Sequence, residues 1–531
     1  MEYKTFGVML DCSRNAVMKV SEVKRFIDYI AKMGYNALEL YTEDTFEVID
    51  EPYFGYLRGK YTLNELREID AYALSKKVEL IPCIQTLAHF TNLVKLPQYA
   101  DIIDVNDILL IDEPKTYELI EKIFKSLRSA FTSKKINIGM DEAHMVGLGK
   151  YLDKHGFSKR FDILLRHLNK VVNIARKYDF APHMWSDMFF RLANHDQYYA
   201  FEGSIDKSVI KEVPDGLALT YWDYYHKEKN QYDIMIEKHQ EFGKEVWFAG
   251  GAWCWFGFAP LNAYSLITMK PAMQSVMEHK VENVIITMWG DNGKECSFFG
   301  LLPALYSIRR FADGEFNEDI IKNEFNELFG FNYDDFFLLD KVNALPVIRE
   351  KLTNENPCKA FLYTDCLMNS FDKTIKNPIE VDYNGIAQKL NEASARVGEF
   401  SYIFNQLASL VKVLEIKATI SKKVRAAYQL KDNEKLTTLL CDFDELENRL
   451  SAFHEAFYIM WHKENKTFGW EIQDARLGGV IQRVKTCKRR ISDYLSGRLE
   501  SLEELEVELL AISEDSIYGN VYAHLISTSC I

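Results

Sequence analysis

The sequence lacks the features that place a protein in a membrane or direct it out of the cell. It has no run of about 20 apolar residues, the length needed to span a bilayer. The first residues, MEYKTFGVMLDCSR, lead directly into an apolar segment. They lack the basic start, long apolar stretch and small-residue cleavage site of a secretory signal. These absences predict a cytoplasmic protein that is not embedded in a membrane.

Closely spaced pairs of cysteines are also absent from the sequence. The nine cysteines are odd in number, form no CxxC pair, and lie at positions 12, 83, 254, 296, 358, 366, 441, 487 and 530. This scatter indicates neither a disulfide framework nor a structural zinc site, and it fits a reducing compartment. The sequence predicts no metal and no other cofactor. His144 is interpreted as a polar residue on a first helical turn, because isolated histidines are more often structural than metal ligands.

Basic clusters are missing as well. The 78 acidic residues outnumber the 64 basic ones, which gives a dispersed net charge of -14. This charge argues against nucleic acid as a partner. Apolar residues make up 47% and charged residues 27% of the chain, the balance of a globular protein with a sizeable core. Because 531 residues exceed what one core usually serves, we expect two domains.

What the sequence does contain is a recurring alternation of strand and helix. Apolar residues three and four apart, as in segments 21–34 and 116–131, predict helices with one buried face. Eight short β-rich segments lie at 4–10, 37–41, 78–84, 136–140, 181–185, 217–222, 245–250 and 282–289. Eight such units predict an α/β fold, a (β/α)₈ TIM barrel, although a doubly wound sheet also alternates strands with helices.

Polar and aromatic residues gather just past nearly every predicted strand. A barrel brings all these strand ends around one opening, whereas an open sheet would spread them along a line. The pattern therefore favours the barrel. After about residue 345 long amphipathic segments replace the strands. We predict a catalytic barrel over 1–345 and a helical domain over 346–531, which packs against the barrel or against a second copy in a homodimer.

Two adjacent acids, Asp141 and Glu142, follow the fourth predicted strand in the segment INIGMDEAHMVG. Neighbouring side chains of an extended chain point to opposite sides, so these carboxylates cannot face each other across a sugar. One is expected to act as a general acid while its ionised neighbour orients another group. Taken alone, the pair is equally well explained as a cap on the following helix.

The surroundings of the acids favour a sugar pocket. Five of the eight tryptophans lie at or just past predicted strands 5 to 8, namely Trp185, Trp222, Trp253, Trp255 and Trp289. Indole rings pack well against the apolar faces of pyranose rings and against acetamido methyl groups. One or two of these tryptophans are expected to be core residues instead. Polar groups suited to sugar hydroxyls stand beside them: Arg14, Asp187, Asp223 and Asp291.

Together these motifs resemble glycoside hydrolase family 20, the β-N-acetylhexosaminidases, over roughly residues 5 to 310. The motifs occur in the family's order: DxxR after strand 1, TLAHF after strand 3, GMDE at strand 4, WSD at strand 5, YWD at strand 6 and WGD at strand 8. The resemblance implies a hydrolase that removes a terminal N-acetylhexosamine from a carbohydrate.

The resemblance also implies roles for individual residues. Glu142 matches the general acid/base, and Asp141 matches the acid that holds the acetamido nitrogen. Tyr221 matches the tyrosine that steadies the acetamido oxygen, the atom that attacks the anomeric carbon. A substrate-assisted reaction through an oxazolinium ion is therefore expected, with retention of configuration.

Further matches concern the bound sugar. Arg14 and Asp291 match groups that grip its hydroxyls, Trp289 matches the floor of the pocket, and Trp185 matches part of the acetamido cage. Asp223 is expected to meet the substrate. Asp44 and His89 are looser matches, with His89 supporting the acid through a hydrogen bond.

The chain departs from the family's pattern at several points. Met140 replaces the usual second glycine, and Asp291 stands where many members have glutamate. The shorter side chain leaves the choice between N-acetylglucosamine and N-acetylgalactosamine open. Two alternatives also remain: another retaining glycosidase with two opposed carboxylates, or a non-catalytic carbohydrate-binding protein on the same fold.

Overall fold

A computed structural model describes residues 2–194, 196–202 and 207–529. The chain forms two compact units, and neither is one continuous stretch of sequence. The first contains Met1–Ala252, Ser265–Trp289 and Ala304–Asn317, and the second contains Trp253–Tyr264, Gly290–Pro303 and Glu318–Ile531. The second unit therefore includes two segments from within the barrel sequence. The simple division into 1–345 and 346–531 stays a prediction.

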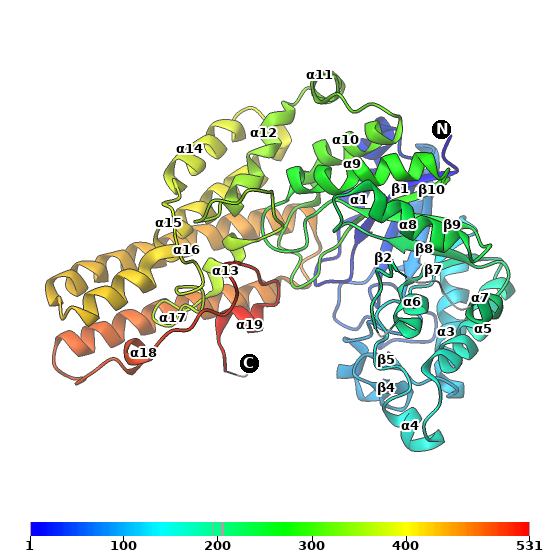
Figure 1. Ribbon diagram of the computed structural model, residues 1–531, viewed down its shortest axis with the longest axis horizontal. Coiled ribbons are helices and arrows are strands. Elements are labelled where there is room, and N and C mark those ends of the chain that lie inside the picture. Colours follow the sequence, from blue (N-terminus) through cyan, green and yellow to red (C-terminus); the bar gives the residue numbers. More distant parts are fainter. Residues whose placement is uncertain (1, 195, 203–206, 530–531) are drawn as a thin grey trace. The chain divides into compact units, whose positions relative to one another are not determined.

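The first unit is a closed barrel of eight parallel strands, so the predicted fold class is confirmed (Figure 1). The order around the barrel is β1, β10, β9, β8, β7, β6, β3 and β2. The strands are β1 Thr5–Asp11, β2 Ala37–Thr42, β3 Glu79–Ile84, β6 Lys135–Asn137, β7 Ala181–Trp185, β8 Ala218–Trp222, β9 Val246–Gly251 and β10 Asn283–Met288. A small antiparallel pair that the sequence did not predict, β4 Ile103–Val105 and β5 Ile108–Leu109, lies between β3 and β6 in the chain.

Apolar side chains fill the barrel because its strands are buried on both faces. Tyr41, Trp185 and Trp247 are the bulky members of this core, and Trp222 and Trp289 pack against it while staying partly exposed. Trp247 was not among the predicted sugar-binding residues and is a core residue here. Gly250 in β9 leaves room for the helix behind it, since a Cβ there would lie 2.4 Å from the sulfur of Met269.

Helices connect the strands and surround the barrel. The first, α1, ends at Gly34, which adopts a left-handed conformation that suits glycine. A capping box between Thr62 and Glu65 starts α2. The helices of this region are α1 Val20–Met33, α2 Leu63–Ser75, α3 Pro114–Arg128, α4 Lys150–His155, α5 Arg160–Lys177, α6 Asp187–Ala193, α7 Lys207–Glu212, α8 Lys229–Gln240, α9 Asn262–Glu278 and α10 Leu302–Ala312, with the short 3₁₀ helices η1 Leu93–Lys95, η2 Pro97–Ile102 and η3 Phe298–Leu301.

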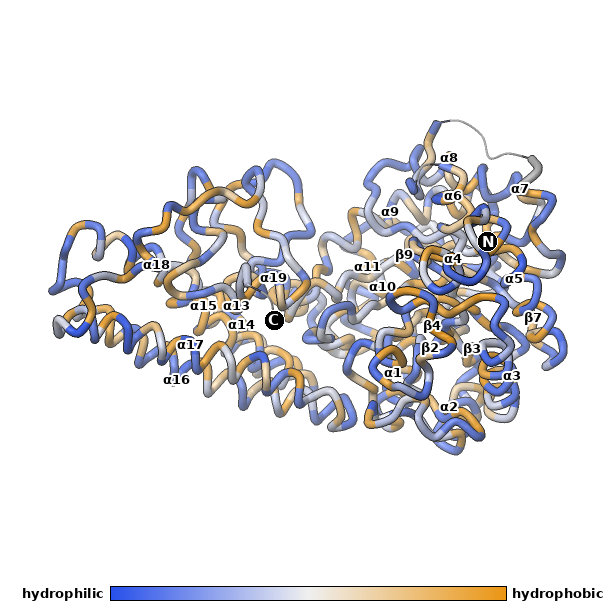
Figure 2. The backbone as a smooth tube through the Cα atoms, turned by 90° about the horizontal axis from the view of Figure 1, so that it is seen from below, coloured by the Kyte–Doolittle hydropathy of each residue, from blue (hydrophilic) through white to orange (hydrophobic). Residues whose placement is uncertain are grey.

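The second unit is mainly helical. Its long helices are α15 Ser401–Gln429, α16 Asn433–Glu464 and α17 Trp470–Leu495. In Figure 2 the tube of α16 alternates between hydrophilic and hydrophobic colours, as expected for a helix with one buried face. Helix α16 packs against both α15 and α17. The remaining helices are α11 Glu318–Phe329, α12 Tyr333–Phe337, η4 Leu339–Asn343, α13 Pro357–Tyr363, α14 Tyr383–Ser394, η5 Gly398–Phe400, α18 Glu503–Glu506 and α19 Tyr522–Ile526. Within the described ranges, the helices are too short or too polar to cross a membrane.

Candidate active site

The two adjacent acids lie in an irregular loop after β6. The strand ends at Asn137, not at Met140 as predicted. Gly139, Met140 and Glu142 all have positive φ angles, of 73°, 69° and 51°. The chain is therefore not extended here, and the alternation expected of a strand does not apply. Such left-handed conformations in non-glycine residues are costly and gather at functional sites.

Asp141 is held from two sides by polar side chains. Gln85 Nε2 donates to Asp141 Oδ1 at 2.7 Å, and His89 Nε2 lies 3.1 Å from Asp141 Oδ2. Burial acts to raise the pKa of Asp141, but the charge of His89 and the two hydrogen bonds outweigh it and lower the pKa. Burial also opposes the charged form of His89, yet the Asp141 carboxylate raises the pKa of His89 to about 9. Asp141 is thus kept ionised and oriented.

Glu142 has different surroundings. Its side chain is 44% exposed, and its Oε2 lies 3.9 Å from His89 Nε2. Its backbone N–H donates to Asp187 Oδ2 at 3.1 Å, and Arg191 Nε donates to the same oxygen at 3.1 Å. Burial, followed by the charge of Asp141, raises the pKa of Asp187 to about 7. The two acids therefore occupy unequal environments on one loop.

The structure argues against the helix-cap alternative for the acids. The next helix, α4, begins at Lys150 with Gly149 as its N-cap. The Asp141 side chain bonds to Gln85 and His89 instead. His144, predicted to lie on a first helical turn, lies in this loop before α4, and its Nδ1 is 3.6 Å from Asp196 Oδ1.

Arg14 belongs to a charged group at the ends of β1 and β2. Its Nε donates to Glu43 Oε1 at 3.0 Å, and its guanidinium lies 5.6 Å from the ring centre of Tyr41 and 5.8 Å from that of Trp289. Tyr41 donates to Glu43 at 3.1 Å and accepts from Gln85 at 3.0 Å. A chain of contacts thus joins Arg14 through Tyr41 and Gln85 to Asp141. Asp44, in contrast, pairs with Arg58 at 3.3 Å.

Tyr221 and Asp223 form a buried pair at the end of β8. The Tyr221 hydroxyl donates to Asp223 Oδ2 at 2.6 Å, and His226 Nδ1 lies 2.6 Å from the same oxygen. Burial, then the charge of Asp223, raises the pKa of Tyr221 well above its ordinary value. The tyrosine is therefore a neutral hydrogen-bond donor. Its predicted role toward an acetamido oxygen stays a prediction.

Two of the predicted tryptophans meet at the carboxyl ends of the strands. The ring centres of Trp185 and Trp289 are 5.9 Å apart, and Trp289 contacts Tyr41 edge to face at 4.8 Å. Trp222 stacks on Tyr224 with centres 5.6 Å apart. The Trp185 Nε1 atom is buried and has no acceptor among the described residues, so an oxygen of a bound sugar could accept from it.

The other three predicted site residues belong to the second unit. Trp253 and Trp255 stack with ring centres 4.2 Å apart and are almost fully buried. Asp291 lies in the loop after β10 and has a φ of 29°. The roles predicted for these three residues stay predictions.

Several functional contacts involve residues that the sequence analysis did not select. Gln85 is the main one, because it bonds to Asp141, to Tyr41 and, through its Oε1, to the backbone N–H of Met140 at 3.1 Å. It directly precedes the TLAHF motif, which was the available signal. Glu43 pairs with Arg14, 29 residues earlier in the chain, and only its place next to Asp44 indicated it. Arg191 pairs with Asp187 of the WSD motif, and the spacing of four residues was the available signal.

One group of side chains has a geometry that a cation could use. Among the described residues, ligand atoms of His89, Asp141 and Glu142 lie within 4.8 Å of one another. The hydrogen bonds described above already account for the positions of His89 and Asp141, so the prediction of a metal-free reaction is kept.

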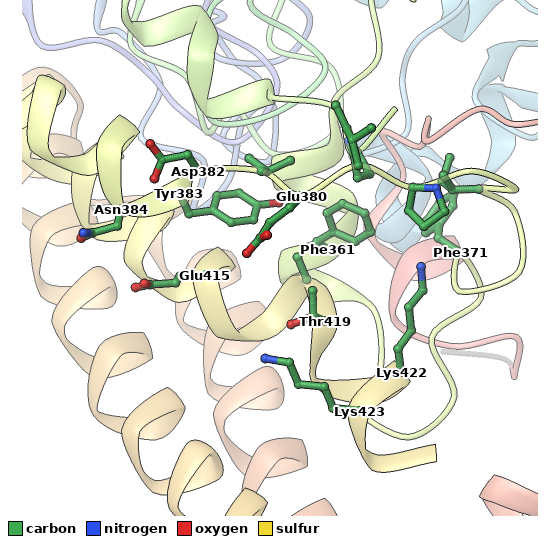
Figure 3. Close-up of a pocket in the computed structure, with 16 residues that line it drawn as sticks. Phe361, Phe371, Glu380, Asp382, Tyr383, Asn384, Glu415, Thr419, Lys422 and Lys423 are labelled. Atoms are coloured by element: carbon green, nitrogen blue, oxygen red, sulfur yellow. The ribbon is translucent and has the colours of Figure 1, made fainter. Parts of the chain in front are cut away.

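A separate hollow of about 850 Å³ lies in the second unit (Figure 3). Its lining mixes aromatic side chains such as Phe361 and Phe371 with charges of both signs, including Glu415, Lys422 and Lys423. None of the predicted site residues lines it.

Comparison with known proteins agrees with this geometry. Residues 3–235 match the family description "Glycosyl hydrolase family 20, catalytic domain", and residues 334–520 match "Glycoside Hydrolase 20C C-terminal domain". In enzymes with this barrel, the active site lies at the carboxyl ends of the strands. The chain belongs to glycoside hydrolase family 20.

Individual relatives are distant. The chain is 25% identical to human "Hexosaminidase D", over 44% of this chain and 49% of that protein. It is 28% identical to "Beta-hexosaminidase" of Vibrio furnissii, over 26% and 29% of the two chains. The chain thus spans about half the length of these relatives or less. A solved exo-β-N-acetylglucosaminidase from Vibrio harveyi matches with 15% identity and a TM-score of 0.48, covering 64% of this chain and 58% of that one.

Proposed function

We propose that this protein is a retaining exo-β-N-acetylhexosaminidase that uses the acetamido group of its substrate as the nucleophile. The substrate is a carbohydrate ending in β-linked N-acetylglucosamine or N-acetylgalactosamine. The observation that carries the proposal is the pair of unequal acids on one loop. Asp141 is buried and held ionised by His89 and Gln85, whereas Glu142 is half exposed.

These surroundings suit two different tasks. An ionised, oriented Asp141 can accept a hydrogen bond from the acetamido nitrogen and stabilise the positive charge that develops in the oxazolinium ion. An exposed Glu142 can give its proton to the leaving oxygen and later take one from water. The acetamido oxygen attacks C1 as the bond from C1 to the leaving oxygen breaks, and water then opens the cyclic ion with overall retention.

The alternative with two opposed carboxylates finds less support. Asp187 is the acid nearest the loop, but it is fully buried and already accepts from the Glu142 N–H and from Arg191. A carboxylate occupied in this way is a poor nucleophile toward a sugar carbon. It serves better as a support for the loop.

Release of nitrophenol from aryl β-N-acetylhexosaminides tests the proposal. Glu142→Gln and Asp141→Asn should each lower kcat by about a hundredfold or more, the usual effect of losing an acid catalyst or a preorganised electrostatic group. A thiazoline that mimics the oxazolinium ion should inhibit the wild type. Azide should not yield a glycosyl azide of inverted configuration with Asp141→Asn. Equal rates for wild type and Glu142→Gln would refute the proposal, and so would absence of thiazoline inhibition.

We further infer a cytoplasmic location and association as a homodimer, for which the odd number and scattered positions of the cysteines and the helical region gave the reasons above. Fractionation of the source cells and sedimentation of the purified protein test these two inferences.

A further inference from the structure

Strand β8 presents different side chains to the two faces of the barrel wall. Successive residues of a strand point to opposite faces, and in a closed barrel one face is the interior while the other faces the helices. Ala218 belongs to the hydrophobic core inside the barrel, and Trp222, four residues later, packs against the same core. Trp222 also pairs with Ala249 of β9, another member of this core. Trp222 therefore faces the interior at the carboxyl end of β8.

Tyr221 lies on the opposite face of β8. It pairs with Phe248 of β9, and the centres of the two rings are 5.5 Å apart. Its ring centre lies 4.9 Å from that of His239, a buried residue of helix α8. Phe248 in turn contacts Tyr232 of the same helix, with ring centres 6.0 Å apart. The fully buried side chain of Tyr221 thus points away from the interior and toward the surrounding helices.

The hydroxyl of Tyr221 has a partner on this outer face. Asp223 is two residues further along the chain and accepts the hydroxyl proton at 2.6 Å. Its other carboxylate oxygen accepts from the backbone N–H of Tyr225 at 3.0 Å and from that of His226 at 3.3 Å. A tyrosine hydroxyl donates one hydrogen bond, and here Asp223 takes it. Tyr221 and Asp223 therefore hold the end of β8 and the loop that follows it.

Trp222 lies beside the loop of the two acids. Strands β6, β7 and β8 are neighbours in the barrel, so the end of β8 is two strand spacings, about 10 Å, from the end of β6. Between them, the backbone N–H of Trp185 at the end of β7 donates to the Gly139 carbonyl in the acid loop at 3.2 Å. Trp222 stays partly exposed. It borders the same opening as the acids, at the end of the barrel where active sites lie.

Aromatic neighbours hold the indole ring of Trp222. Tyr224, two residues later, stacks on it with ring centres 5.6 Å apart and an angle of 21° between the planes. The ring centre of Tyr198 lies 4.6 Å away, and the Tyr198 hydroxyl accepts from the backbone N–H of Trp222 at 3.0 Å. A rigid aromatic surface with one open side suits an apolar group of a ligand, such as the methyl of an acetamido group.

We propose that Trp222 is the β8 residue that contacts the acetamido side of the terminal sugar, and that Tyr221 and Asp223 do not touch the substrate. This inference rests on the proposed function, in which Asp141 holds the acetamido nitrogen. The indole of Trp222 forms a wall for the acetamido methyl and so limits the size of the N-acyl group that the site accepts.

Exchange of the two neighbouring residues tests the proposal. We compare Tyr221→Phe, Trp222→Phe and Trp222→Ala with aryl β-N-acetylglucosaminide and its N-propanoyl and N-butanoyl analogues. Trp222→Ala should lower kcat/KM for the N-acetyl substrate about tenfold or more, because a large apolar contact is lost. The cavity should also raise the relative rate with the N-butanoyl analogue. Trp222→Phe keeps a ring, should fold even where Trp222→Ala does not, and should give intermediate values.

Tyr232→Phe is the matched control for Tyr221→Phe. It also removes a single buried hydroxyl on the outer side of β8, one that donates to the carbonyls of His226 and Thr268. Both variants should lower Tm, because buried acceptors lose their donor. Tyr221→Phe should change kcat no more than Tyr232→Phe does. A hydroxyl that touched the acetamido oxygen would instead cost kcat about a hundredfold or more.

The outcomes distinguish this inference from the proposed function. A hundredfold fall in kcat of Tyr221→Phe alone would overturn it. Unchanged kcat/KM and an unchanged N-acyl preference in both Trp222 variants would do the same. The proposed function would then still stand if the wild type is active and Asp141→Asn is not. A wild type without turnover of any N-acetylhexosaminide would overturn both.

Discussion

At the scale of single residues, the loop of the two acids depends on a glycine. Gly139 has a φ of 73°, and a Cβ there would lie 2.2 Å from Gln85 Oε1 and 2.6 Å from the Ile84 carbonyl. Gln85 is one of the two groups that hold Asp141. A methyl group at position 139 would therefore displace the partner of a catalytic acid as well as strain the backbone.

Gly139→Ala should destabilise the protein and lower its activity. Gly156→Ala is the matched control, since Gly156 has a φ of 71° but nothing lies within 4 Å of its Cβ position. The control should lose about 1–3 kcal/mol of unfolding free energy from backbone strain alone, because a φ of 71° with a ψ of -178° is a conformation that side chains disfavour. Gly139→Ala should lose more, and its kcat should fall. Equal losses of stability and full activity in both variants would show that the close approach to Gln85 is unimportant.

The ion pair of His89 with Asp141 predicts a pH dependence of stability. The pKa of His89 is raised from 6.5 to about 9 in the folded state. Its contribution is therefore fully present below pH 6.5 and is lost as the pH rises through about 9. Because one pKa unit corresponds to about 1.4 kcal/mol, the contribution is at most about 3.5 kcal/mol.

Urea unfolding of wild type and His89→Asn measures this contribution. The difference in unfolding free energy between them should shrink as the pH is raised from 6 to 10. His454→Asn is the control, because His454 pairs with Asp474 at an exposed position and exposed pairs contribute little. A constant difference between wild type and His89→Asn would contradict the charged state assigned to His89.

At the scale of elements, the strands were predicted more accurately than the loops. Seven of the eight predicted strands agree with the structure within about two residues, since buried parallel strands are short apolar runs that the sequence shows directly. The exception, β6, ends at Asn137 because Gly139 and Met140 turn the chain out of the extended conformation. The apolar pattern of the sequence does not indicate this turn, because it depends on contacts with Gln85. These are the hydrogen bond from the Met140 N–H and the close approach of Gly139.

Helix α17 contains an exposed glycine that is expected to lower the stability of the helix. Gly478 lies in the middle of this helix, and nothing lies within 4 Å of its Cβ position. Gly478→Ala should raise the unfolding free energy by about 0.5–1 kcal/mol, because alanine loses less backbone entropy in a helix. Thermal unfolding measures the change, and a lower Tm would contradict the described packing of α17. Activity should be unchanged.

At the scale of the whole molecule, segments of the two units alternate along the chain. Segments Trp253–Tyr264 and Gly290–Pro303 belong to the helical unit, although they connect strands and helices of the barrel. Phe258 in the first segment contacts Phe453 and Phe457 of α16, each with ring centres 5.4 Å apart. The helical unit thus completes its core with residues from the barrel sequence.

A chain shortened to residues 1–345 should therefore fail to form a stable barrel. Phe258 would lose its contacts with Phe453 and Phe457, and Phe256 would lose its contact with Tyr518, which leaves an exposed apolar patch. We expect aggregation or loss of the cooperative thermal transition, measured by light scattering and circular dichroism. A soluble, cooperatively folding fragment would show that the helical unit is dispensable.

The sequence by itself determined the eight strands, the helical region and the motifs that resemble glycoside hydrolase family 20, because apolar periodicity and short motifs are local properties of the chain. The tertiary structure decided which distant groups control the acids. Gln85 and His89 reach Asp141 from the loop after β3 only because the barrel closes β3 against β6. It also decided that Asn292 and Glu295 meet Lys359 and Arg476, since contacts across more than 60 residues follow from packing and leave no periodic signal.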